Sequence, residues 1–125
     1  MPKVSRESAP NVQSHEMAEQ RSAEVAGQRI DFVSIRRSHD LAPMLKGLPD
    51  DRCQCAHWGY VFAGKLTWQF ADHQEVYQAG DAFYAPPGHT PAAEEGTEFV
   101  QFSPADELRE TEEVIMKNFQ AMQGG

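Results

Sequence analysis

The chain has 125 residues, the size of one domain and too short for two cores of ordinary size. Hydrophobic residues make up 40% and aromatic residues 10%, which is typical of a globular protein, although the mean hydropathy of -0.60 indicates solvated segments. A formal net charge of -8 argues against nucleic acid and anionic membranes as partners. Because there is no membrane-spanning apolar run and no apolar signal core near Met1, we expect a cytoplasmic protein.

The N-terminal residues 1–27 are rich in Ser, Glu, Gln and Ala and poor in large apolar side chains. Such a segment cannot offset the entropy of its own ordering, so the composition predicts a partly flexible N-terminal arm that could dock on a partner subunit. Within it, residues 17–26 could form a short helix that Gly27 would end.

Residues 28–103 read as a series of short strands separated by turn residues, which predicts an all-β barrel or sandwich. The alternation over 65–70, the turn 71–74 and the strand 75–77 together predict a hairpin. Strands over 81–85 and 98–102, with the turn 94–97 between them, complete the set. Two prolines and a glycine predict a loop over 42–49, with Met44, Leu45 and Leu48 turned inward as a possible cover for a pocket.

The C-terminal residues 104–125 are expected to form a helix, to about Ala121, and a tail. Ser103 has the chemistry of an N-cap, and Pro104 suits the first helical position. The apolar residues expected on one stripe of this helix are Leu108, Ile115, Phe119 and Met122.

Glycines bracket the hairpin in a pattern that resembles the cupin family. The spacing from His57 to Gly64 is that of E(x)6G, and the run from Gly80 through Pro86 to Gly88 has the form G(x)5PxG. Fifteen residues separate Gly64 from Gly80, as the family requires. This resemblance, to a small single-domain cupin, implies an antiparallel jelly-roll β-barrel over 28–103.

The metal-binding positions depart from the family, which uses three histidines and a glutamate. The matching positions here hold Asp51, Cys53, His57 and Pro91. Cys55 lies between two of them and His89 precedes the last by two residues, so strand alternation would keep each on the same side as its neighbour.

We therefore expect a metal site at the barrel mouth, with the candidate ligands Cys53, Cys55, His57 and His89. Two thiolates and two imidazoles suit a divalent transition metal, and zinc above iron, nickel or manganese. Cys53 and His57 lie four residues apart, about 13 Å on a straight strand, so the strand must bend between them. A disulfide between Cys53 and Cys55 would close a very small strained ring, so reduced thiols are expected.

Three functions fit these features. The first is a metal-dependent enzyme acting on a small organic molecule, with an unidentified acid or base among Asp51, His57, Tyr84 and His89. The second is a module that binds a metal or metabolite without turnover. The third is a metal-free ligand-binding or structural barrel whose cysteines are packing residues. The cupin resemblance also implies a homodimer.

Overall fold

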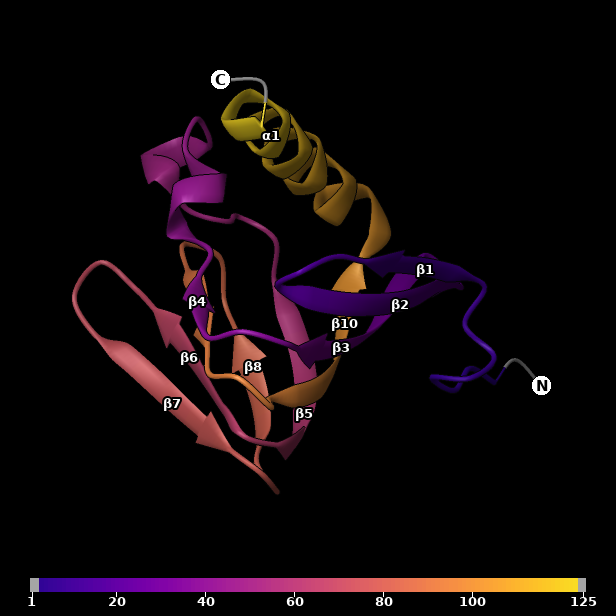
Figure 1. The fold of residues 1–125 in the computed structure, drawn as a ribbon. Helices are drawn as coiled ribbons and strands as arrows, with labels where there is room; N and C mark the ends of the chain where they lie inside the picture. The colour runs from indigo at the N-terminus through magenta and orange to yellow at the C-terminus, as the bar shows by residue number, and fades with distance from the viewer. Residues whose placement is uncertain (1–2, 124–125) are drawn as a thin grey trace.

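The computed structural model describes residues 3–123 and contains two antiparallel sheets and a C-terminal helix (Figure 1). The larger sheet contains, in spatial order, β1 (Asn11–Ser14), β2 (Ala18–Val25), β3 (Gln28–Ile35), β10 (Glu98–Pro104), β5 (His57–Ala63) and β8 (Ala82–Ala85). The smaller sheet contains β4 (His39–Asp40), β9 (Thr90–Ala93), β6 (Lys65–Gln69) and β7 (Gln74–Gln78). Two short 3-10 helices, η1 (Ala42–Leu45) and η2 (Pro49–Asp51), precede β5, and α1 (Ala105–Gln123) follows β10.

The sequence predicted an all-β barrel followed by a C-terminal helix, and the structure confirms a mostly β fold of antiparallel sheets with that helix. The β6–β7 hairpin is also confirmed, and its turn is closed by a hydrogen bond from Phe70 N to the carbonyl of His73. Across residues 3–123, backbone hydrogen bonds do not join the two sheets into one closed barrel. In the same part of the chain, no helix combines the length and apolar character needed to cross a lipid bilayer.

The N-terminal segment differs from the expected arm. Its residues form β1 and β2 at one side of the larger sheet, and the helix expected over 17–26 is wrong. Ala26 and Gly27 form a two-residue turn with φ of 51° and 79°, which matches the right-handed twist of a hairpin. Pairing with β3 then satisfies the backbone of β2, and this tertiary contact outweighs the helix propensity of Ala, Glu and Gln.

The main core lies between the two sheets and is built from side chains that alternate along their strands. Its buried members are Ala18, Ile35, Val61, Leu66, Trp68, Phe83, Ala85 and Phe99. Because alternate residues of β5, β8 and β10 point into this core, the residues between them face away from it.

A second, smaller core closes one end of the sheets, where α1 lies beside η1 and η2 (Figure 1). Leu45 and Leu108 are buried there with the two cysteines, and Ile115 packs against them. This confirms that apolar residues of the 42–49 loop turn inward. On the predicted helix stripe, Leu108 is buried and Phe119 is half-buried, whereas the side chain of Met122 lies outside the described residues.

Candidate metal centre

Three of the four predicted ligands meet at the end of the sheets that α1 covers. One ligand atom each from Cys53, His57 and His89 lies within 4.8 Å of the other two. The thiol Sγ of Cys53 is 3.7 Å from Nε2 of His57, and the two imidazole ring centres are 4.9 Å apart. All three residues are buried.

The backbone brings these residues together from two separate segments. Cys53 N donates to the carbonyl of His89 at 2.9 Å, and Gly88 N donates to the carbonyl of Cys53 at 2.8 Å. Between Cys53 and β5 the chain bends at Cys55 instead of running as a strand, which confirms the expected bend. The bend shortens the separation of about 13 Å that a straight strand would impose on Cys53 and His57.

Hydrogen bonds to the outer nitrogens orient both imidazoles. His89 Nδ1 lies 2.6 Å from the carbonyl oxygen of Pro86, and because a carbonyl only accepts, Nδ1 carries the proton. Nε2 of His89 is therefore an unprotonated acceptor, and it is buried with no hydrogen-bond partner among the described residues. His57 Nδ1 lies 2.7 Å from the hydroxyl of Ser103, which can donate or accept the hydrogen bond and so fixes the orientation of the ring. Such partners are typical of metal-binding histidines.

Burial keeps the group neutral in the absence of a cation. It lowers the pKa of His57 to about 3, with a contribution from the neighbouring His89, and it also lowers the pKa of His89. Burial raises the pKa of the Cys53 thiol. Because metal ligands are neutral imidazoles and thiolates, the two histidines are already in the binding form, whereas Cys53 would lose its proton to a bound cation.

Cys55 does not join the group. Its Sγ lies 3.5 Å from the carbonyl oxygen of Ala56 and 4.0 Å from that of Pro104. Burial raises the pKa of Cys55 to about 12. The alternation argument that placed Cys55 beside Cys53 assumed a regular strand, and the bend at Cys55 removes that assumption.

Two candidate acids or bases lie away from the group. Asp51 is exposed in η2, where its carboxylate accepts from the backbone N–H of Gly47 at 2.9 Å. Tyr84 lies on the outer face of β8, with its ring centre 5.0 Å from that of Trp58. Of the four candidates, only His57 and His89 lie in the group.

Three neighbours of the group were not singled out as site residues from the sequence. Ser103 belongs to β10, and its buried hydroxyl contacts His57. The prediction that this hydroxyl caps the helix is therefore wrong. The indole of Trp68 contacts both imidazoles, with ring centres at 5.5 and 4.7 Å. Thr111 on α1 places its hydroxyl 3.7 Å from Sγ of Cys53. The sequence could have indicated Ser103 only by strand alternation, because Ser103 lies four residues after the buried Phe99 and therefore on the same face of β10.

A cleft of about 270 Å³ lies between η2 and α1, immediately outside this group. Cys55 and Thr111 line it, Leu48 adds an apolar wall, and Glu107 and Glu110 supply carboxylates. Thr111 therefore both lines the cleft and contacts the thiol of Cys53.

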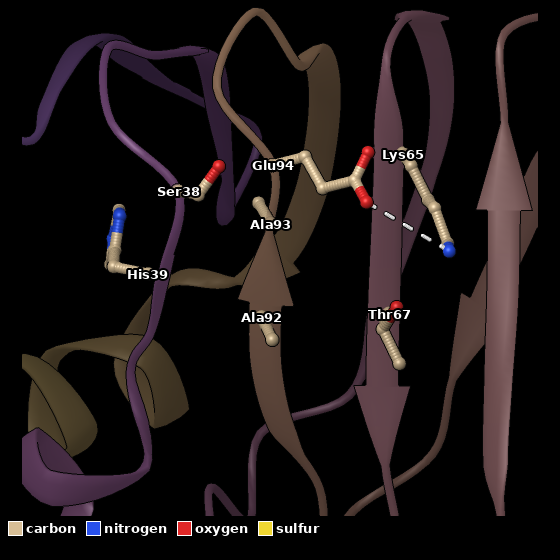
Figure 2. Close-up of a pocket in the computed structure, with 7 residues that line it drawn as sticks. All are labelled: Ser38, His39, Lys65, Thr67, Ala92, Ala93 and Glu94. Atoms are coloured by element: carbon tan, nitrogen blue, oxygen red, sulfur yellow. Dashed lines mark ion pairs between the residues drawn. The ribbon is translucent and has the colours of Figure 1, made fainter.

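A larger hollow of about 350 Å³ lies on the smaller sheet, and Figure 2 shows its lining. Four of its polar side chains already make contacts within the protein. Lys65 Nζ lies 3.9 Å from the Glu94 carboxylate, the hydroxyl of Ser38 accepts from Glu95 N, and His39 Nδ1 contacts the carbonyl of Arg37. This hollow therefore offers less chemistry than the buried Cys/His group.

Comparison with solved structures identifies the fold. The chain is similar to a protein of unknown function from Rhizobium leguminosarum bv. viciae, with a TM-score of 0.61 and 18% identity over 82% of this chain and 95% of that one. It is also similar to KdgF from Halomonas sp. (TM-score 0.52, 21% identity, 75% and 86% of the two chains). An RmlC-like cupin from Shewanella frigidimarina matches with a TM-score of 0.52 and 16% identity over 75% and 83% of the two chains.

No protein-family model matches the sequence, and no curated protein matches it either. The chain has the cupin fold, as the glycine spacing led us to expect.

Proposed function

We propose that this cupin-fold protein binds a divalent transition metal through Cys53, His57 and His89 and uses the centre to bind or act on a small organic molecule. The observation that carries the proposal is Nε2 of His89, a buried acceptor without a partner in residues 3–123. An unpaired buried polar atom costs free energy, and a cation held jointly with Cys53 and His57 would remove that cost.

The donor set suits several metals. One thiolate and two imidazoles match zinc, and imidazoles also bind iron and nickel, so zinc remains the first expectation although the Cys55 thiol is not part of the group. Three protein ligands leave a fourth tetrahedral position for a ligand of another molecule. A metal bound there would polarise a carbonyl or another oxygen donor of that molecule.

The small molecule is proposed to bind in the cleft between η2 and α1. This cleft borders Thr111 and Cys55, and both residues contact Cys53. On the other sides of the Cys/His group, Leu45 and Leu108 pack in the same cluster as Cys53, and Trp68 of the main core contacts both imidazoles.

A metal-free role is the second candidate, and the packing of the group favours it. The indole of Trp68 stacks on His57 with ring centres 5.5 Å apart, and burial keeps the thiol and both imidazoles neutral. In this alternative, Cys53 and the histidines are core residues of a ligand-binding or structural protein.

Metal analysis of three proteins tests the proposal. Wild-type protein is expected to retain about one transition metal ion per chain, to lose it in Cys53→Ala and to keep it in the matched control Cys55→Ala. Cobalt substitution should add a thiolate-to-cobalt absorption band with the same dependence on Cys53. A wild-type protein that takes up neither native metal nor cobalt supports the metal-free alternative.

The sequence-based expectation of a cytoplasmic homodimer stays part of the proposal. So does the division into an N-terminal region of residues 1–27, a β region of 28–103 and a C-terminal region of 104–125, although strands occupy much of the first region.

A further inference from the structure

The outer face of the larger sheet carries an unusual set of exposed aromatic side chains. They are Trp58, Tyr60, Phe62, Tyr84 and Phe102. Each exposes between 40% and 49% of its surface, and all come from three neighbouring strands, β8, β5 and β10. Scattered single aromatics on a surface need no explanation, but a contiguous group marks an interaction site.

The register of the strands makes the group contiguous. Trp58 lies directly opposite Tyr84 on one side and Phe102 on the other. Tyr60 lies opposite Val100, and its ring centre is 5.4 Å from that of Phe62.

Charge is absent from the centre of this aromatic face. The charged residue of β10 is Glu98, at the end of the strand, and its carboxylate is paired with Arg6 at 2.6 Å. Next to β10, the half-buried Ile30 and Phe32 of β3 lie opposite Phe102 and the buried Val100.

The area of the aromatic face agrees with a dimer interface of ordinary size. Five aromatic side chains that are slightly less than half exposed present roughly 450 Å² of apolar surface. A stable interface covers about 800 Å² per partner, of which about 60% is apolar, so it needs roughly 500 Å².

We infer that the aromatic face is the interface of the homodimer, and that it packs on the same face of a second copy; the inference rests on the homodimer proposed above. A second copy supplies a partner that is equally aromatic and uncharged at its centre, and a two-fold axis makes each contact twice. The net charge of -8 on each chain lies outside this uncharged centre, so the copies meet without burying unpaired charges. The same charge disfavours an anionic membrane as the occupant.

This interface would lie directly behind the metal centre. His57 points inward and its neighbour Trp58 points outward on β5, so one strand carries a ligand on one face and an interface residue on the other. The interface does not depend on a bound metal, since no member of the aromatic face belongs to the Cys/His group.

Sedimentation equilibrium of the full chain tests the inference. Wild-type protein is expected at twice the 14.0 kDa chain mass. Tyr60→Lys and Phe62→Lys should each raise the dissociation constant of the dimer at least about thirtyfold, because a lysine charge would be buried at the centre of the interface. The control Val76→Lys changes an apolar residue of similar exposure on the smaller sheet, and it should leave the dimer intact.

Hydroxyl-radical footprinting of the wild-type protein gives a second measurement that needs no variant. Trp58, Tyr84 and Phe102 should be protected, whereas Met116, which is exposed on α1, should be oxidised. A wild-type monomer overturns both the homodimer and the interface. A dimer that survives both lysine variants, or that leaves Trp58 unprotected, overturns the interface alone.

Discussion

At the scale of single residues, one main-chain carbonyl and one hydroxyl group orient the two imidazoles of the candidate metal centre. The carbonyl of Pro86 holds the proton of His89 on Nδ1, and Ser103 holds the ring of His57. These contacts leave Nε2 of His57 free to lie 3.7 Å from Sγ of Cys53, and they leave Nε2 of His89 buried without a partner among residues 3–123. The candidate centre therefore depends on residues that bind no metal themselves.

Gly64 and Gly80, the two glycines that flank the β6–β7 hairpin, differ in how much space surrounds them. Both have positive φ, 79° at Gly64 and 95° at Gly80. A Cβ at Gly64 would overlap the side chain and Cα of Thr97, a fully buried residue, whereas a Cβ at Gly80 would meet open space.

We predict that Gly64→Ala lowers the free energy of unfolding by about 3 kcal/mol or more, and Gly80→Ala by about 1 kcal/mol. The second substitution carries only the backbone strain, while the first adds a clash with Thr97. Urea unfolding of both variants measures the difference, and equal losses would show that the clash is relieved by movement of Thr97.

At the scale of elements, α1 covers the site through a few specific contacts. Leu108 is buried against Leu45 and the cysteines, and Asn118 donates to the carbonyls of Met44 and Lys46 at 2.7 and 2.8 Å. Glu112 accepts two hydrogen bonds from Arg29 of β3, both at 2.8 Å. The helix is thereby tied both to the η1 segment and to the larger sheet.

Leu108→Ala is expected to destabilise the protein by about 2 to 4 kcal/mol, because it removes buried methyl groups and leaves a cavity in the smaller core. Met116→Ala on the exposed side of the same helix should change stability by less than about 0.5 kcal/mol. Chemical unfolding monitored by circular dichroism checks both values. Similar losses in the two variants would mean that α1 does not pack as described.

At the scale of the whole molecule, the metal-free protein holds two histidines neutral in its interior. Burial lowers the pKa of His57 from 6.5 to about 3 and also lowers that of His89. Between pH 6.5 and about pH 3, His57 is protonated in the unfolded chain but stays neutral in the folded chain. The stabilising contribution is fully present above pH 6.5 and is lost as the pH falls toward about 3.

We therefore predict that the free energy of unfolding of the metal-free protein falls with decreasing pH below 6.5, by up to about 1.4 kcal/mol per pH unit for His57 alone. His57→Gln should flatten this slope, and His73→Gln, which changes an exposed histidine, should keep it. Burial raises the pKa of Asp31, an opposite effect that is common to all three proteins and does not alter the comparison. Urea unfolding with a chelator, from about pH 7 to about pH 4, gives the slopes. Identical slopes in wild type and His57→Gln would contradict the prediction.

The amino-acid sequence by itself determined the local features of this protein. Alternation and turn residues predicted the β6–β7 hairpin, and helical periodicity predicted α1, because both depend on neighbours within a few residues. The glycine and proline spacing also indicated the cupin fold and brought Cys53, His57 and His89 forward as candidates.

Only the tertiary structure decided how distant segments combine. N-terminal residues form β2 because they pair with β3. Local helix or strand propensity cannot predict this tertiary pairing. The Cys55 thiol is not part of the candidate centre, because the chain bends at Cys55 and Cys53 pairs with His89, thirty-six positions further along the chain. Ser103 serves His57 instead of the helix because its place on β10 turns the hydroxyl inward. The direction of the side chain at each of these positions follows from long-range strand pairing. The free energy of this pairing is larger than the free-energy differences that underlie local helix and strand propensities.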